Sequence, residues 1–373
     1  MADVLVERLE VRDYRSYEHA ECTLAPGVTV LHGPNGSGKT NLLEALGLAC
    51  TGRSARTRDE RELIRTGAKE ASVALNTTAS GATNRISVTI SPGSPRVVRV
   101  NGSRVEQVQA LEARPLVCLF IPDRMALVKG APSGRRAHLD AVVGALRPSR
   151  RGDRSAYARA LSQRNALLSS IRAGRSGPAT LSAWNYQLAE HAVQLRDGRA
   201  QSVEVLAPQV ALRAQQLGLD GELRLLYRAR SDAADAAMFA AELQQHTPRD
   251  LERGFSTHGP HRDDLVLRHD GRDLRRYGSQ GQQRLALLAL LFAERDVLAA
   301  STGSAPLMLL DDVFSELDAQ RRALLLADLQ SSGQSVITTT DLGHVGEVAD
   351  VTAATVSIPD GVMPRVAHAP VAA

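Results

Sequence analysis

The sequence predicts an α/β fold in which a mixed sheet, flanked by antiparallel strands, is interrupted by an inserted, mostly helical arm. Three observations predict it: a glycine-rich segment that follows a short apolar run, a second apolar run far downstream that ends in two aspartates, and helical periodicity between them. Parallel strands need long connections and lie in one sheet. Residues 1–122 and 250–373 are therefore expected to form one head domain, and residues 123–249 to form the arm.

The segment GPNGSGKT has the spacing of a phosphate-binding loop, and the apolar run Val28–Leu31 before it reads as a buried strand. Its glycines can adopt backbone angles that turn successive amide N–H groups toward a phosphate. Lys39 supplies a charge for the outer phosphates of a nucleoside triphosphate, and Thr40 a hydroxyl for Mg²⁺. A glycine-rich turn without a ligand is the alternative. The residues expected to bind the nucleotide here are Gly33, Pro34, Asn35, Gly36, Ser37, Gly38, Lys39, Thr40 and Asn41.

The second apolar run, Leu307–Leu310, reads as a short buried strand and ends in Asp311 and Asp312. Asp311 is expected to hold Mg²⁺ together with Thr40, and Asp312 to orient or deprotonate the attacking water. A solvated acidic turn that caps the helix starting near Asp318 is the alternative. With Lys39, these two aspartates are the catalytic candidates.

The segment YGSQGQQRLALLALLFAERDVLA reads as a helix capped by Ser or Gly, with an apolar face at Leu285, Leu288, Leu291 and Phe292. An ordinary capped helix explains it. The polar string Ser279–Gln283 nevertheless offers hydrogen-bonding groups around Gly281, which has no side chain, and such a surface suits an anion.

Helical patterns dominate the arm. In LSAWNYQLAEHAVQL, the residues Leu181, Trp184, Leu188, His191 and Leu195 recur at intervals of three and four, which indicates a short coiled-coil-like seam. His191 is interpreted as an edge residue of this seam rather than as a metal ligand.

Three further features complete the organisation. Alternating runs at Ala71–Thr77, Arg85–Ile90 and Val97–Val100 predict an antiparallel sheet beside the parallel one. The segment HGPHRDD, His258–Asp264, is interpreted as a structural or nucleotide-proximal turn, with a metal site as the alternative. The small-residue tail VMPRVAHAPVAA is expected to fray.

The composition restricts the classes of function that are possible. The 373 residues carry a net charge of +4, which permits a nucleic-acid partner without establishing one. The absence of a long apolar run and of a signal peptide predicts a cytoplasmic protein with no membrane partner. Cys22, Cys50 and Cys118 have no metal-ligand spacing and are expected to be small buried residues.

The phosphate loop, the SQGQQ helix and the LLDD strand together resemble the ABC-type ATPases, and the sequence of these segments is similar to one family, the RecF recombination and repair proteins. For residues 145–250, the resemblance is in the general character of the residues more than in their exact sequence. It runs through LEVRDYRSYEHAECTLAPGVTVLHGPNGSGKTNLLEAL, GRSARTRDERELIRTG, FIPDRMALVKGAPSGRRAHLDAV, STHGPHRDDLVL, YGSQGQQRLALLALLFAE, LLDDVFSELDAQRR and SVITTT.

The resemblance implies an ATP-dependent homodimer in which the SQGQQ helix completes the nucleotide site of the partner subunit. Asp312 stands where typical ABC proteins carry Glu, and slow, DNA-stimulated ATP hydrolysis is expected. Arg15 is a further candidate to approach the phosphates. The residues expected to contact the nucleotide across the dimer are Ser279, Gln280, Gly281, Gln282, Ser315 and Asp318.

The resemblance also implies double-stranded DNA or gap junctions as ligand, with the mediators RecO and RecR and the recombinase RecA as partners. Nucleoid association is implied only by this family resemblance. The DNA-contact candidates could instead form solvated faces paired with nearby acids such as Asp59, Glu60 and Glu62. A transporter ATP subunit is disfavoured by the long arm and by SQGQQ in place of LSGGQ, and an SMC-type organiser by the shortness of the arm. The DNA-contact candidates are Arg53, Arg56, Arg58, Arg61, Arg65, Arg147, Arg150, Arg151 and Arg154.

Overall fold

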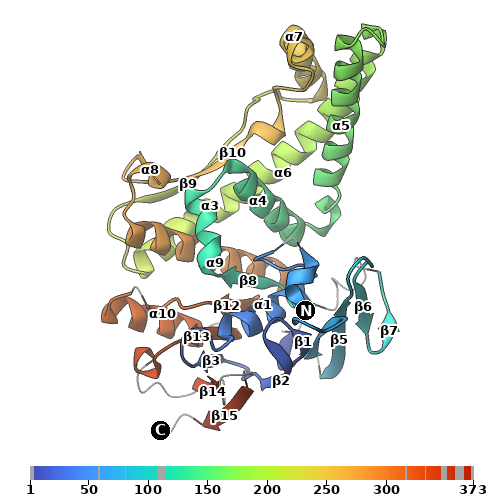
Figure 1. Ribbon diagram of the computed structural model, residues 1–373. Coiled ribbons are helices and arrows are strands. Elements are labelled where there is room, and N and C mark those ends of the chain that lie inside the picture. Colours follow the sequence, from blue (N-terminus) through green and yellow to red (C-terminus); the bar gives the residue numbers. More distant parts are fainter. Residues whose placement is uncertain are drawn as a thin grey trace. The chain divides into compact units, whose positions relative to one another are not determined.

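The computed structural model describes residues 4–57, 59–79, 81–106, 114–315, 317–331, 333–345, 351–357 and 365–370 (Figure 1). The chain divides into two compact units. The first comprises residues 1–124, 216–218 and 291–373, and the second comprises residues 125–215 and 219–290.

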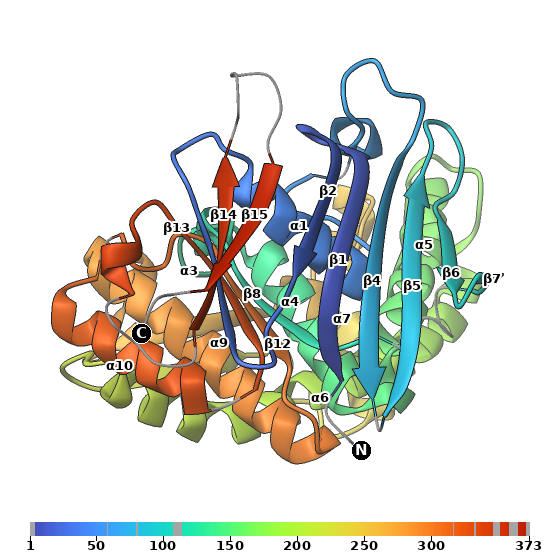
Figure 2. The same ribbon diagram turned by 90° about the horizontal axis from the view of Figure 1, so that it is seen from below.

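The first unit contains a sheet with the order β15-β14-β3-β13-β12-β8 (Figure 2). Its strands are β3 (Val28–His32), β8 (Val117–Phe120), β12 (Leu307–Leu310), β13 (Ser335–Thr339), β14 (Val351–Ser357) and β15 (Arg365–Pro370). All neighbours are parallel except β14 and β15, so the predicted parallel arrangement is confirmed. The predicted fraying of the tail is wrong for Arg365–Pro370, because backbone pairing with β14 does not need large apolar side chains.

A second, antiparallel sheet of this unit has the order β2-β1-β4-β5-β6-β7. Its strands are β1 (Leu5–Tyr14), β2 (Tyr17–Thr23), β4 (Ala71–Ala79), β5 (Ala82–Ile90), β6 (Val97–Val100) and β7 (Ser103–Arg104). The three strands predicted beside the parallel sheet are confirmed as β4, β5 and β6. Asn101 and Gly102 have φ of 51° and 83° and join β6 to β7, as this dipeptide favours.

Helix α1 (Lys39–Thr51) lies between the two sheets (Figure 2). Leu42, Leu43 and Leu46 share one buried cluster with residues of both sheets. Gln334, directly before β13, also joins the sheets: its side-chain amide donates to the carbonyls of Val6 and Ala25 at 2.7 and 2.8 Å. Burial on every side explains why α1 is apolar almost all round.

The second unit is built on helices. They are α3 (Ala126–Lys129), α4 (Pro132–Leu146), α5 (Asp153–Arg172), α6 (Leu181–Gln216) and α7 (Ala236–Arg253). Helices α5, α6 and α7 share one apolar cluster (Figure 1). In the predicted seam, Leu181, Leu188 and Leu195 are buried, whereas Trp184 and His191 are half-buried. The seam is thus confirmed as the packed face of α6.

This unit also contains a sheet that the sequence did not predict, with the order β11-β10-β9. Its strands are β9 (Leu223–Arg228), β10 (Asp264–His269) and β11 (Arg272–Asp273). Arg135 of α4 forms a two-point ion pair with Asp264 of β10 at 2.8 Å. These contacts keep residues 250–290 with the second unit, so the border near residue 291 differs from the predicted return at residue 250.

The remaining elements are short turns and three helices. The helices are α8 (Leu274–Tyr277), α9 (Gln280–Thr302) and α10 (Ala319–Ser331). The turns are η1 (Glu60–Leu63), η2 (Pro122–Met125), η3 (Pro148–Arg150), η4 (Pro178–Thr180), η5 (Pro260–Arg262) and η6 (Leu342–His344). Within the described ranges, every helix is too short or too polar to cross a membrane.

Candidate functional site

The glycine-rich loop connects β3 to α1 in the first unit. Gly36 and Gly38 have φ of 80° and 97°, a left-handed conformation that costs other residues free energy. A Cβ atom on Gly38 would lie 2.6 Å from the hydroxyl oxygen of Tyr17, which is buried in β2. The backbone N–H of Gly33 donates to the carbonyl of Thr339 in β13. The loop thus has the predicted strand-loop-helix context.

Lys39 is the first residue of α1, and its side chain folds over the loop. The ammonium donates to the carbonyls of Gly33 at 2.7 Å and Pro34 at 2.9 Å. Burial lowers the pKa of Lys39, and the nearby carboxylates of Asp311 and Asp312 oppose this shift. The ammonium therefore lies between the loop carbonyls and the acidic end of β12.

Thr40 and Asp311 meet although the chain separates them widely. The Thr40 hydroxyl lies 2.9 Å from each carboxylate oxygen of Asp311, and the Thr338 hydroxyl donates to Oδ1 at 2.6 Å. Burial raises the pKa of Asp311, and the bonds from Thr338 and Thr40 partly offset this. These hydroxyl and carboxylate oxygens are of the type that Mg²⁺ prefers. The residues present therefore fit a magnesium ion.

Asp312 is held in an unusual backbone conformation. Its φ is 47°, and its backbone N–H donates to the Thr338 hydroxyl at 2.9 Å. A non-glycine residue with positive φ is uncommon and is found disproportionately at functional sites.

The SQGQ segment begins α9 in the second unit. The Ser279 hydroxyl accepts from the Gln282 N–H at 3.2 Å, and the Gln282 side chain accepts from the Ser279 N–H at 2.8 Å. This reciprocal capping box bears out the capped-helix interpretation. Gln280 and Gly281 are exposed, and nothing described lies within 4 Å of a Cβ placed on Gly281. Packing within the described chain therefore does not explain the glycine.

Two residues after β12 also have local partners. Asp318 accepts from the Arg321 N–H at 2.8 Å and forms an ion pair with its guanidinium at 3.0 Å, so it caps α10. The cap of α10 is therefore Asp318 itself. The Ser315 hydroxyl donates to the Asp312 carbonyl at 3.1 Å and is exposed.

Several predicted DNA-contact arginines in the first unit already have partners. Arg56 donates to Asn41 at 3.1 Å and pairs with Glu44 at 3.2 Å, and Arg65 pairs with Asp13 at 2.6 Å. The alternative interpretation of these arginines named Asp59, Glu60 and Glu62 as the paired acids, so the observed partners are different acids. Arg53 and Arg61 are exposed, and Arg58 lies outside the described residues.

The second arginine group holds the second unit together. Arg147 donates to the Gln201 side chain at 2.6 Å, Arg150 to the Gln194 carbonyl at 2.9 Å and Arg151 to the Gly144 carbonyl at 3.0 Å. Arg154 lies 3.7 Å from Asp140. These contacts connect the α4–α5 region to α6 and within itself.

Sequence reasoning missed two residues near the loop, Glu44 and Thr338. Arg15, with φ of 53°, forms a two-point ion pair with the buried carboxylate of Glu44 at 2.8 and 2.9 Å. Arg15 was a candidate to approach the phosphates, but in the structure its guanidinium binds Glu44. Thr338 was read only as part of a strand. Its position at the carboxyl end of a parallel strand was the signal that could have identified it.

The HGPHRDD segment is a structural turn. The Tyr157 hydroxyl donates to His261 Nδ1 at 2.6 Å, and His261 Nε2 donates to the Ser256 carbonyl at 3.1 Å. Asp263 is buried beside Arg199, and His258 binds Glu242 at 2.8 Å. All of these contacts lie within the second unit. They support the structural interpretation of the turn.

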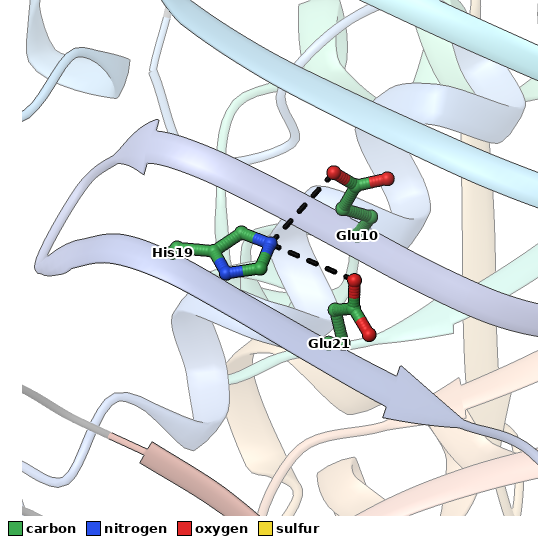
Figure 3. A group of neighbouring side chains, drawn as sticks. All are labelled: Glu10, His19 and Glu21. Atoms are coloured by element: carbon green, nitrogen blue, oxygen red, sulfur yellow. Dashed lines mark ion pairs between the residues drawn. The ribbon is translucent and has the colours of Figure 1, made fainter.

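Among the described residues, one group has the geometry of metal ligands: Glu10 and His19 with Glu21, on β1 and β2 (Figure 3). His19 Nε2 lies 3.7 Å from one oxygen of each glutamate. Arginines already bind both carboxylates, and Arg85 lowers the pKa of Glu10 to about 2. The group is therefore an ion-pair network on the surface of the sheet. Buried Cys22, Cys50 and Cys118 are free thiols, as expected.

Comparison with known proteins gives a consistent family. Residues 5–362 match the family model described as RecF/RecN/SMC N terminal domain. The chain is similar to "DNA replication and repair protein RecF" of Anaeromyxobacter sp. (strain Fw109-5), with 40% identity over 89% of this chain and 91% of the relative. The protein of the same name from Acidothermus cellulolyticus is 38% identical over 89% of this chain and 93% of the relative.

Solved structures agree with these relatives. A structure of the recombination mediator protein RecF with ATP, in the RecFOR pathway, has a TM-score of 0.85 and 28% identity, and the match covers 99% of this chain and 98% of that chain. An Smc head bound to the C-winged helix domain of ScpA has a TM-score of 0.61 at 18% identity. The latter supports the ABC-type head fold alone.

Proposed function

Because this chain belongs to the RecF family of DNA replication and repair proteins, we propose that it binds ATP and Mg²⁺ at the β3–α1 loop and uses ATP to close a dimer on double-stranded DNA. The observation that carries the proposal is the Thr40–Asp311–Thr338 group. It places a carboxylate beside the first turn of the helix that follows a phosphate loop, which is the arrangement a Mg²⁺–nucleotide site needs. The similarity to an ATP-bound RecF structure supports ATP as the nucleotide.

Each residue of the site in the first unit would have a separate role in binding the nucleotide and the metal. Thr40 and Asp311 hold the metal, Asp311 through water. Lys39 exchanges its bonds to the loop carbonyls for bonds to the outer phosphates, which its flexible stem allows. Bound Mg²⁺ supplies positive charge beside the leaving and transferred phosphates. The amide N–H groups around Gly36 and Gly38 bind the remaining phosphate oxygens.

Asp312 would orient or deprotonate the attacking water. Its carboxylate is one methylene shorter than the Glu of typical ABC proteins, so it reaches less far toward a γ-phosphate. We infer slow ATP hydrolysis that DNA stimulates and that times the dimer rather than driving movement. The positive φ of Asp312 supports a functional position for this residue.

The dimer would form because Ser279, Gln280, Gly281 and Gln282 bind the nucleotide of the partner subunit, with Ser315 and Asp318 along the same seam. The exposure of Gly281, with open space where a Cβ would lie, supports approach by a second chain. Hydrolysis removes the γ-phosphate that both subunits contact, and the loss of these contacts favours dissociation.

The DNA ligand would be duplex or a junction with single-stranded DNA, and the dimer would help RecO and RecR load RecA at gaps. The RecFOR pathway of the similar solved structure supports these partners. Exposed Arg53 and Arg61 are the candidates of the first group whose side chains are best placed to meet phosphates. The other described candidates would have to exchange an internal bond for a phosphate contact.

Light scattering with Mg²⁺ and ATP, ADP or no nucleotide, with and without duplex DNA, tests the proposal. The wild type is expected to have twice the monomer mass with ATP only. Ser279→Arg is expected to remain a monomer that still binds ATP, and Ser182→Arg, on an exposed site of α6, is the matched control. A mass that ignores ATP, or dimerisation of Ser279→Arg, would contradict the shared nucleotide site.

A further inference from the structure

A basic hollow of the second unit lies on its three-stranded sheet, directly before the SQGQ segment. Its volume is about 600 Å³, and its lining carries four guanidinium groups and one carboxylate. The lining residues are Arg228, Arg268, Gly271, Arg272, Asp273, Arg276 and Tyr277. We call this the β9–β11 hollow.

The four arginines of the hollow differ from the DNA-contact candidates described above. The side chains of Arg228, Arg268, Arg272 and Arg276 form no hydrogen bond or ion pair with other described residues, and Nε of Arg268 is buried without an acceptor. Buried polar groups are rarely left unsatisfied, and charged ones cost the most. The arrangement thus keeps a concentrated positive charge ready for an external anion.

The lining holds one acid against four guanidinium groups, so its net charge stays positive. Asp273 accepts from the backbone N–H of Arg275 at 3.0 Å and so caps α8. The neighbouring Arg224 of β9 shows the contrast: it lies outside the lining and pairs with Glu222 at 2.7 Å. Free arginines are therefore a property of the hollow and not of the whole sheet.

Size and position favour a nucleic-acid backbone over a single phosphate. The hollow is several times larger than one phosphate group, and its guanidiniums come from both strand and helix positions. Tyr277 is 67% exposed at its edge and offers a planar face to a sugar or base. An adjoining hollow shares Arg272, Asp273 and Tyr277 and extends to Gln282 of the capping box.

We propose that the β9–β11 hollow binds consecutive phosphates of a DNA backbone and thereby connects DNA contact to the Ser279 segment. This inference rests on the DNA binding proposed above and adds a site to it. Arg–phosphate contacts release condensed counterions, so each lost contact reduces the slope of log affinity against log salt by about 0.9 on duplex DNA.

The test compares the wild type with the double variant Arg272→Ala/Arg276→Ala in fluorescence-anisotropy titrations of a labelled duplex at several salt concentrations. The double variant is expected to bind more weakly and to lower the salt slope by roughly 1.8, which corresponds to two phosphates. Arg224→Ala, from the same sheet but paired with Glu222, is expected to leave both quantities close to those of the wild type. Thermal unfolding checks that the variants are folded.

A second titration with a fluorescent ATP analogue separates the two sources of phosphate. Unchanged ATP affinity with weakened DNA binding supports the inference. Weakened ATP binding with unchanged DNA binding assigns the hollow to nucleotide phosphates and overturns it, as does a variant that matches the wild type in both. Failure of the wild type to bind DNA overturns both this inference and the proposed DNA function, whereas failure of the variant effect alone leaves the proposed function standing.

Discussion

Replacement of Gly38 by alanine probes the loop most directly, because two features of the structure oppose a side chain there. The residue has φ of 97°, and an added Cβ would lie 2.6 Å from Oη and 3.0 Å from Cζ of Tyr17. Tyr17 is fully buried in the core, so its ring cannot swing into solvent. The loop itself must therefore move away from Tyr17.

The magnitude follows from these two features. The left-handed conformation costs a non-glycine residue about 1–3 kcal/mol. Widening the contact from 2.6 Å to the 3.4 Å of ordinary contact adds an overpacking cost of about 1–3 kcal/mol. The nucleotide-free loop can avoid both costs by shifting, whereas the ligand-binding geometry requires them. Gly38→Ala is thus expected to weaken ATP binding by roughly 30-fold or more, since about 2 kcal/mol is the lower limit.

Gly36→Ala is the matched control, because Gly36 has φ of 80° but open space around a Cβ. It is expected to lose less affinity than Gly38→Ala. Adding Tyr17→Phe to Gly38→Ala removes the nearest atom and is expected to recover part of the loss. Titration with a fluorescent ATP analogue measures all four proteins. If Gly38→Ala binds no more weakly than Gly36→Ala, or Tyr17→Phe recovers nothing, the contact with Tyr17 does not select the glycine.

Three further predictions concern charge. The raised pKa of Asp311 means that its ionised form destabilises the folded, nucleotide-free state above the ordinary carboxyl pKa. Asp311→Asn is therefore expected to keep or raise the melting temperature, while Mg²⁺-dependent phosphate release stops. A lower melting temperature would refute this. Burial lowers the pKa of His261 to about 4. The contribution of His261 to the free energy of unfolding is therefore full above about pH 6.5 and falls as the pH drops toward 4, by at most about 1.4 kcal/mol per pH unit. Chemical denaturation between pH 7 and 4.5 should show a smaller decline of the free energy of unfolding in His261→Gln than in the wild type. Arg164 and Asp250 form a fully buried ion pair at 2.7 Å. Arg164→Met is expected to lower the free energy of unfolding, measured in urea, by about 3–5 kcal/mol, because it leaves the Asp250 carboxylate buried and unpaired. Adding Asp250→Asn should restore part of this loss.

The sequence predicted the parts of the site that depend on local pattern. The loop and the pair Asp311–Asp312 were accessible because each follows a short apolar strand, and parallel strands bring their carboxyl ends together. Thr338 was not, because threonine is common in strands and only the neighbouring strand makes it a donor to Asp311. The bond between Arg15 and Glu44 depends on how β1 meets α1, which no local pattern encodes.

The topology of the second unit could likewise be predicted only in part from the sequence. Helical periodicity predicted α6 correctly, but β9 is short and pairs with a strand that follows a whole helix. The predicted border at residue 250 lies between β9 and its partner β10 for this reason. The capping box at Ser279 was predictable from spacing alone, whereas the arginines of the β9–β11 hollow converge only through the register of β10 with β9 and β11.

The strand order of the parallel sheet has a consequence for how the protein is made. The hydrogen-bonded neighbours of β3 are β13 and β14, at the opposite end of the chain. The ribosome synthesises β3 and the loop early, but about 300 residues must follow before β13 can pair with β3, which takes roughly 15–60 s at about 5–20 residues per second. During that interval the strand and loop lack their partners, so a nascent chain has no complete nucleotide site until translation is nearly finished.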